Sequence, residues 1–126
     1  MAERAEATDI VSLGYPKRER LCRRPDIDRV FKTGARYSCR GMRLHAVPNS
    51  LQYTRVVFVT LHSYPGAVQR NHAKRLLREC WRIRRNSLRG GFDVAIVLFP
   101  GYDEIRTRDA QLDRLLLQAG IEEEKP

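Results

Sequence analysis

Apolar positions recur at helical spacing in some parts of the chain and in strand-like runs in others. Ile27, Val30 and Phe31 share one face of a short helix that Pro25 and Asp26 open. Helical spacing is predicted over residues 25–34, 67–86 and 103–119, and strands over residues 42–47, 55–61 and 92–99. The predicted order is α-β-β-α-β-α, which favours one sheet covered by helices on at least one face.

The length of the chain limits the architecture to a single domain. It has 126 residues, of which 42% are hydrophobic, enough to bury one core. No apolar run approaches the ~18 residues of a membrane-spanning helix, so we expect no membrane contact, and the N-terminus lacks a secretory signal. Residues 1–14 and 122–126 are polar and aperiodic, and we expect them to be flexible tails around one domain over residues 15–121.

Positive charge is concentrated in the middle of the chain. Residues 17–89 hold nineteen Lys and Arg against four acids, a net charge of +15, whereas both flanking segments are negative. Such a distribution indicates a basic face, for which nucleic acid is the first candidate partner. A solvated surface that merely contains many arginines is the alternative.

Cysteines and histidines show no metal-binding pattern. No Cys-x-x-Cys pair occurs, and no zinc spacing links the six residues Cys22, Cys39, Cys80, His45, His62 and His72. We therefore expect neither a disulfide framework nor a protein-bound metal, and three free thiols suit a reducing, cytoplasmic compartment. Cys80 falls on an apolar helix stripe and is predicted to be a small buried residue.

The predicted helix over residues 67–86 is strongly two-faced. At ~100° per residue, one arc collects basic side chains and Asn71: Arg70, Lys74, Arg75, Arg78, Arg82, Arg85 and, just beyond, Arg89. The opposite arc holds the apolar Ala73, Leu76, Leu77, Cys80 and Ile83, with Arg84 straying into it and Trp81 at its border. Glu79 is the only acid between residues 29 and 92, so pairing within the helix cannot neutralise the basic arc. The arc predicts binding to a polyanion.

Residues 70–79 read R-N-x-x-K-R-x-x-R-E, which resembles the signature of the bacterial ribonuclease P protein subunit. Residues 26–34 are similar to that family's D-F-x-x-V-F-x-x-G helix, and residues 91–94 to the G-[FY]-D-[IV] start of its last strand. Order and spacing agree from about residue 15 to 119. The resemblance implies an α+β sandwich of the ribosomal S5 domain-2-like class. It also implies a left-handed β-α-β crossover, a hand that general topology rules would not predict.

The resemblance also implies an activity. In this family a catalytic RNA with Mg²⁺, which is bound mainly by that RNA, removes the 5′ leader of precursor tRNA. The protein subunit binds the catalytic RNA and the leader, so the assembly is an endoribonuclease whereas the protein alone is expected to be inactive. We accordingly predict two RNA partners, the catalytic RNA and precursor tRNA. We predict no obligate protein partner and no catalytic residue within the chain.

Two sets of residues are carried over from the resemblance. The predicted contacts to the catalytic RNA are Arg70, Asn71, Lys74, Arg75, Arg78 and Arg82, although Asn71 could instead cap the helix. The predicted leader contacts are Phe31, Lys32, Arg36, Arg40 and His45, with Arg43 adding charge. Phe31 would stack on a base beside these cations, or would simply pack in the core.

The chain departs from the family pattern at several positions. Ile27 and His45 stand where aromatic residues are common, and residues 61–63 and His72 lack usual cations, which the basic stretch 17–24 could replace. Two rival functions stay open: a structural RNA-binding protein such as a small ribosomal component, and a protein-only nuclease. The nuclease would need clustered carboxylates for Mg²⁺, and the acids of this sequence are scattered. A DNA-binding helix is a weaker third possibility.

Overall fold

The computed structural model describes residues 16–122. The helical elements are η1 (Lys17–Glu19), α2 (Arg24–Thr33), α3 (Ala67–Arg84), η2 (Arg85–Ser87) and α4 (Ile105–Ala119). The strands are β1 (Ala35–Cys39), β2 (Met42–Pro48), β3 (Arg55–Thr60) and β4 (Phe92–Leu98). The predicted helices and strands are all present, and the α+β class is confirmed.

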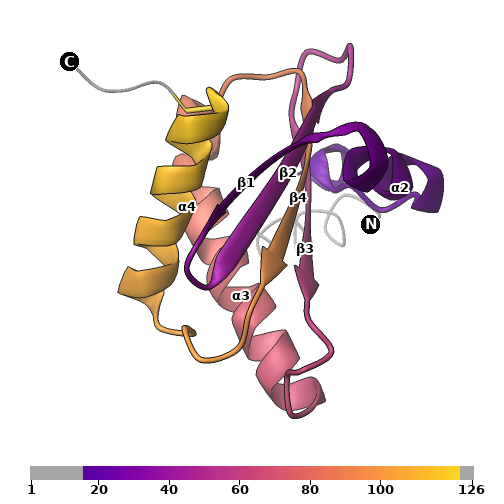
Figure 1. Ribbon diagram of the computed structural model, residues 1–126. Coiled ribbons are helices and arrows are strands. Elements are labelled where there is room, and N and C mark those ends of the chain that lie inside the picture. The colour runs from indigo at the N-terminus through magenta and orange to yellow at the C-terminus, as the bar shows by residue number, and fades with distance from the viewer. Residues whose placement is uncertain (1–15, 123–126) are drawn as a thin grey trace, which may run out of the picture.

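The four strands form one mixed sheet in the order β1-β2-β4-β3. β2 pairs antiparallel with both β1 and β4, whereas β3 and β4 are parallel, with Arg55 opposite Asp93. In sequence, α3 lies between β3 and β4, and it runs back along the sheet to connect the end of β3 to the start of β4 (Figure 1). β3, α3 and β4 therefore form one β-α-β unit.

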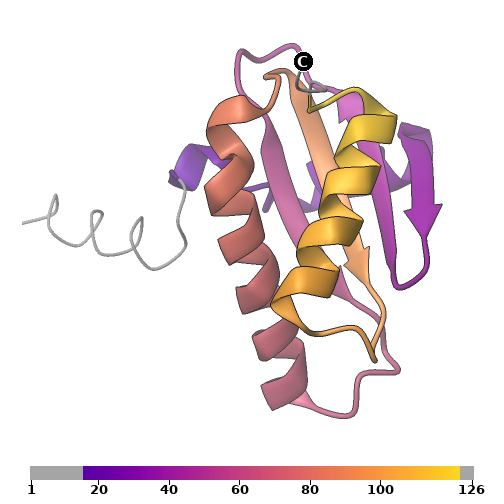
Figure 2. The ribbon, with the colours of Figure 1, turned by 90° about the vertical axis from the view of Figure 1, so that its left-hand side faces the viewer.

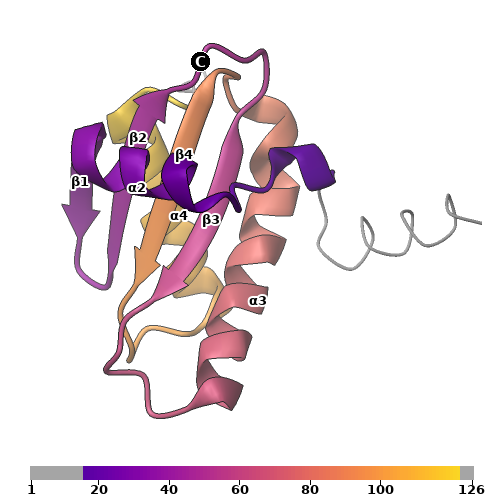
Figure 3. The same ribbon diagram turned by 90° about the vertical axis from the view of Figure 1, so that its right-hand side faces the viewer.

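Helices cover both faces of the sheet. α3 and α4 lie side by side on one face (Figure 2), and α2 crosses the upper part of the other face (Figure 3). Followed from β3 through α3 to β4 in these two views, the crossover is left-handed, as the family resemblance implied. The rule that about 98% of such units are right-handed gives the wrong hand here.

Each face of the sheet has its own apolar cluster. The larger one lies under α3 and α4 and includes Leu44, Leu77, Trp81, Ile96 and Leu112, none more than 1% exposed. The smaller one lies under α2, where Leu21, Val30 and Ala95 are buried and Phe31 packs against them. Alternate residues of β2 and β4 thus serve two different cores.

β1 is the one strand that the apolar pattern missed. Ala35, Tyr37 and Cys39 alternate with Arg36 and Ser38 as a strand should, but the segment has no β-branched residue and lies at the sheet edge. The preceding Gly34 ends α2 as predicted. A β-carbon there would lie 2.4 Å from the Val30 carbonyl and 3.0 Å from that of Ala46, so glycine permits α2 to end against β2.

The predicted tails lie almost wholly outside the described residues, which exclude 1–15 and 123–126. Glu122, predicted to begin the C-terminal tail, is instead buried and bonded to Arg84 at 2.9 Å. No helix within residues 16–122 is both long enough and apolar enough to cross a membrane.

Candidate nucleic-acid interface

α3 separates its apolar and basic residues onto opposite faces, as the sequence predicted. Ala73, Leu77, Cys80 and Trp81 are buried against the sheet and α4. The predicted RNA contacts lie on the other side and none is buried: Arg70, Asn71, Lys74, Arg75, Arg78 and Arg82. Cys80 is 1% exposed, which confirms that it is a small buried residue, and burial raises the pKa of its thiol to about 11.

Four of these cations lack an acidic partner within residues 16–122. They are Arg70, Lys74, Arg75 and Arg78, and we refer to them as the α3 cationic face. Arg70 makes one weak hydrogen bond, donated from Nη2 to the Tyr64 carbonyl oxygen at 3.5 Å. Cations on one helix face that lie three or four residues apart, such as Arg70 and Lys74 or Arg75 and Arg78, repel one another. A phosphate backbone would relieve that repulsion.

The basic arc also contains two cations that the protein itself pairs. Arg82 donates from Nε to Glu79 Oε2 at 3.0 Å, and this hydrogen bond lowers the pKa of Glu79. Arg85 donates two hydrogen bonds to the buried Glu19, at 3.1 and 2.7 Å. Arg82, predicted to contact RNA, is therefore compensated in the free protein, unlike the α3 cationic face.

At the C-terminal end of α3 the prediction is wrong for Ile83 and holds for Arg84. Ile83, predicted to lie in the apolar arc, is 65% exposed. Arg84 lies in that arc because α4 supplies acids to receive it. Its guanidinium bonds Asp113 at 2.7 Å, Asp109 at 3.0 Å and Glu122 at 2.9 Å. Acids distant in sequence, which helical periodicity cannot show, therefore allow Arg84 to lie in the apolar arc.

A second surface forms where the end of α2 meets β1 and β2. The Phe31 and His45 rings are tilted by 60° with centroids 4.7 Å apart, and Arg36 is directly opposite His45 in the sheet. Arg43 donates from Nε to His45 Nε2 at 2.9 Å. Burial lowers the pKa of His45, as do the charges of Arg43 and Arg36, so its imidazole is neutral at pH 7. His45 therefore offers a ring and no charge.

The structure brings four of the five predicted leader contacts into one region. Phe31 is half-buried and Lys32 is exposed at the end of α2, beside the paired Arg36 and His45. Arg40 lies instead in the β1–β2 turn. It is four residues beyond Arg36, which corresponds to roughly 13 Å along an extended strand. Its carbonyl oxygen accepts a hydrogen bond from Gln111 of α4.

Asp93 holds α2 and β3 together beneath this second surface. Its carboxylate has no solvent exposure and accepts hydrogen bonds from Arg55 at 2.8 and 2.6 Å, Asn49 at 2.9 Å and Arg29 at 3.5 Å. Burial alone would raise its pKa, but the bonds from Arg55 and Asn49 hold the pKa below the ordinary value. The sequence offered Arg55 only as a strand residue, and only its register with Asp93 reveals the pair.

A buried arginine anchors the other end of the sheet, where α3 begins. Arg108 has no exposed surface and bonds Asp103 at 2.7 Å, the Tyr64 hydroxyl at 3.0 Å and the Gly41 carbonyl at 2.7 Å. Burial is the main cause that raises the pKa of Tyr64 to about 12. The backbone carbonyl of Tyr64 also accepts the weak hydrogen bond from Arg70, so this network lies next to the first turn of α3. No sequence signal marked Arg108 as different from the exposed arginines.

The acids of residues 16–122 do not fit a metal site. No three His, Cys, Asp or Glu side chains in that part of the chain gather closely enough to hold an ion. The buried carboxylates already accept hydrogen bonds from arginines: Glu19 from Arg85, Asp93 from Arg55 and Glu122 from Arg84. The half-buried Asp103 accepts from Arg108.

The comparisons with known proteins agree with one another. The Ribonuclease P family model matches residues 15–119. A ribonuclease P protein component from Dehalococcoides mccartyi is 41% identical over 78 residues, which is 62% of this chain and 63% of that protein. One from Caldanaerobacter subterraneus subsp. tengcongensis is 30% identical over 111 residues, covering 86% of this chain and 96% of that protein. The RNase P protein of Thermotoga maritima superposes with a TM-score of 0.72 at 25% identity, covering 79% and 96% of the two chains.

Proposed function

The chain belongs to the Ribonuclease P protein family, and from this premise we propose that it binds the catalytic RNA and the 5′ leader of precursor tRNA. Ribonuclease P is an endoribonuclease that acts as a ribonucleoprotein, and the chain is a protein component of that kind. The observation that carries the proposal is the α3 cationic face, whose four charges have no acidic partner in residues 16–122. A cytoplasmic location follows from the proposed role.

The α3 cationic face suits the backbone of a folded RNA. Arg70, Arg75 and Arg78 can each donate a planar pair of hydrogen bonds to one phosphate, and Lys74 adds a point charge. Binding displaces condensed counterions from the RNA, so the affinity falls as salt is added. The Arg108 network lies beside the start of the helix, where Tyr64 contacts both Arg108 and Arg70.

The surface around Phe31 suits a single strand. Unpaired bases stack on aromatic rings while nearby cations follow the phosphates, and here Phe31 and His45 supply rings beside Lys32, Arg36 and Arg43. We assign the 5′ leader to this surface. Arg40 would contact a more distant phosphate of the same strand.

The Mg²⁺ of the reaction belongs, in this proposal, to the catalytic RNA. The buried carboxylates are engaged by arginines, and the acids of residues 16–122 form no cluster that fits the ion. The roles left to this chain are to bind the RNA, to orient the leader and to neutralise phosphate charge. No residue of the chain is assigned a chemical step.

Reconstitution tests the proposed function. The measurement is leader removal from precursor tRNA at low Mg²⁺ by the catalytic RNA alone, by the protein alone and by the two together. We expect faster cleavage in the mixture than with RNA alone, and none with the protein alone. Turnover by the isolated polypeptide, or a mixture no faster than the RNA, would overturn the proposal.

The Phe31→Ala substitution is expected to weaken binding of leader-bearing tRNA by ~1–3 kcal/mol, the value of one stacked base. Mature tRNA, which lacks the leader, should lose much less. Phe31→Leu is the matched control because it keeps apolar volume but removes the ring. Equal losses for both tRNAs would show that Phe31 serves only the core under α2.

The Glu79→Gln substitution is expected to strengthen binding of the catalytic RNA several-fold. It removes the acid that pairs with Arg82 and frees that cation for phosphate, so the log–log salt dependence should steepen by up to ~0.9. Titrations at several salt concentrations measure both effects. Glu104→Gln, which removes an exposed acid just before α4, should leave the salt dependence nearly unchanged. Weaker binding by Glu79→Gln would contradict the assignment of this face.

A further inference from the structure

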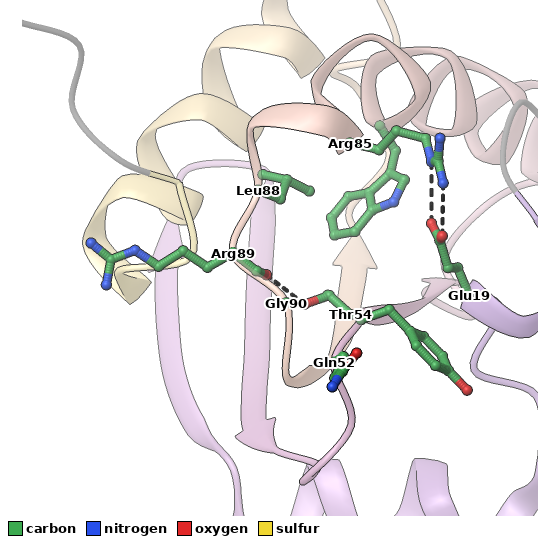
Figure 4. Close-up of a pocket in the computed structure, with 9 residues that line it drawn as sticks. Glu19, Gln52, Thr54, Arg85, Leu88, Arg89 and Gly90 are labelled. Carbon is green, nitrogen blue, oxygen red and sulfur yellow. Dashed lines mark hydrogen bonds and ion pairs between the residues drawn. The ribbon is translucent and has the colours of Figure 1, made fainter.

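A small pocket lies where η1, the β2–β3 loop and the C-terminal end of α3 meet (Figure 4). Its volume is about 160 Å³, well below the ~300–1,000 Å³ of sites for drug-sized ligands. The pocket lies beyond the motif of residues 70–79, because Arg85 is fifteen residues from Arg70, or roughly 22 Å along a helix. It is also separate from the surface around Phe31, which lies on the α2 side of the sheet.

The lining of the pocket combines hydrogen-bonding groups with apolar surface. Arg85 bonds both carboxylate oxygens of Glu19 across one side, as the dashed lines in Figure 4 show. A carboxylate can accept about four hydrogen bonds, so Glu19 keeps capacity for a ligand donor. Leu88 lines the pocket as well, and Gln52 adds an amide that both donates and accepts.

Trp81 gives the pocket an unpartnered donor. Its side chain is 1% exposed, lines the pocket and makes no hydrogen bond to any residue between 16 and 122. Its indole N–H is not fully enclosed in the core. Among residues 16–122, the side-chain nitrogens that are both fully enclosed and without a hydrogen bond are those of Arg20. An N–H that reaches the pocket and has no acceptor in residues 16–122 is free to donate a hydrogen bond to an acceptor on a ligand.

The rim of the pocket resembles a nucleotide site in its chemistry. Tyr53 lines the pocket, and the Arg18 guanidinium lies 5.0 Å from the centroid of its ring. Lys17 is exposed in the same turn of η1, and Arg85 lies on the α3 side. Aromatic and guanidinium planes stack on bases, and cations at the rim bind phosphate.

We propose that this pocket binds one unpaired nucleobase of an RNA partner, with its phosphate on the η1 cations. The inference rests on the proposed function, because it takes the RNA of that assembly as the source of the base. The pocket accommodates a single planar heterocycle that accepts from the Trp81 N–H and donates to Glu19. It gives the protein a third RNA contact, at the far end of α3 from the motif.

Trp81 is the only tryptophan of the chain, so its indole N–H gives a single resonance that reports on the pocket directly. In a titration with each nucleoside 5′-monophosphate, we expect a saturable shift of this resonance by at least one of them. Ribose 5-phosphate, which lacks a base, should not shift it. If no nucleotide shifts the resonance, or ribose 5-phosphate shifts it equally, the pocket does not bind a base.

Variants of Tyr53 test the same site within the assembly. Tyr53→Ala should raise the dissociation constant of the active nucleotide by roughly 5- to 150-fold, the equivalent of one base stack, whereas Tyr53→Phe should restore binding. The catalytic RNA and precursor tRNA are then added separately. The RNA that shifts the Trp81 resonance is the one that supplies the base. A resonance unmoved by both overturns the inference.

The failure of this inference is distinguishable from failure of the proposed function. Arg75→Ala should weaken binding of the catalytic RNA and leave the nucleotide titration unchanged, because Arg75 does not line the pocket. If Arg75→Ala weakens RNA binding while Tyr53→Ala affects neither RNA nor nucleotide, only the pocket assignment is wrong. If the unsubstituted protein does not bind the RNA at all, the proposed function is wrong.

Discussion

Replacing the whole α3 cationic face with alanine is expected to weaken binding of the catalytic RNA by roughly three orders of magnitude near 0.1 M salt. Each phosphate contact contributes about 0.9 to the log–log salt dependence, so losing Arg70, Lys74, Arg75 and Arg78 should flatten the slope by about 3.6. The fold should persist, because none of the four is buried or ion-paired within residues 16–122 and alanine favours helix. Salt-dependent titrations with the RNA measure both quantities.

The matched control removes exposed arginines that lie elsewhere. Arg106 and Arg114 are exposed on α4, so alanine at both lowers the net charge without touching the α3 cationic face. Its salt slope should stay within a few tenths of the unsubstituted value. If the salt slope changed equally per charge removed in the two variants, RNA affinity would depend on total charge alone, and α3 would have no special role.

Asp93→Asn is expected to lower the free energy of unfolding by about 3 kcal/mol, the low end of the range for breaking a buried ion pair. The substitution keeps the size of the side chain but leaves Arg55, only 20% exposed, facing a neutral amide. Chemical denaturation measures the loss. Because Asp93 also receives Arg29 of α2, leader binding should weaken in the same variant.

Asp28→Asn is the control for Asp93→Asn. The Arg24–Asp28 pair lies on the same helix with side chains 87% and 51% exposed, so its loss should cost no more than a few tenths of a kcal/mol. If the two substitutions had equal effects, the burial of Asp93 would be irrelevant to stability.

The pH dependence of the Asp93→Asn effect has a definite sign. The folded pKa of Asp93 lies below its ordinary value of 3.8, so its contribution to stability is complete above that value. It is lost as the pH falls through the folded pKa. The stability difference between the unsubstituted protein and Asp93→Asn should therefore be constant near neutrality and shrink below about pH 4. Unfolding curves over a pH series check this, and a gap that widens in acid would contradict it.

Local patterns predicted the helices, three strands and the basic face of α3, because each depends on residues close in sequence. The same periodicity wrongly predicted that Ile83 is buried. It placed Arg84 in the apolar arc correctly, but it could not show that Asp109, Asp113 and Glu122 pair with this arginine there. β1 was missed because an edge strand needs little apolar sequence. The hand of the crossover came only from the family resemblance, since local sequence does not encode it.

The candidate surfaces likewise combine features that local sequence predicts with features that depend on contacts between distant residues. Helical spacing placed the α3 cationic face correctly, but could not show that Arg85 is paired with Glu19, sixty-six residues earlier. The Phe31–His45 contact joins α2 to β2 and depends on how the helix crosses the sheet. Arg108 and Asp93 were indistinguishable from surface charges in the sequence, because burial of a charge is decided by its partners.

The central claim is that the α3 cationic face lies against the catalytic RNA, and RNA cleavage by a tethered iron chelate tests it most directly. The chelate is attached at Asn71→Cys on α3 or at Arg114→Cys on α4, in a Cys22→Ser background that removes the exposed native thiol. We predict localised cleavage of the catalytic RNA from position 71 and little from position 114. Cleavage from position 114 with none from position 71 would contradict the account.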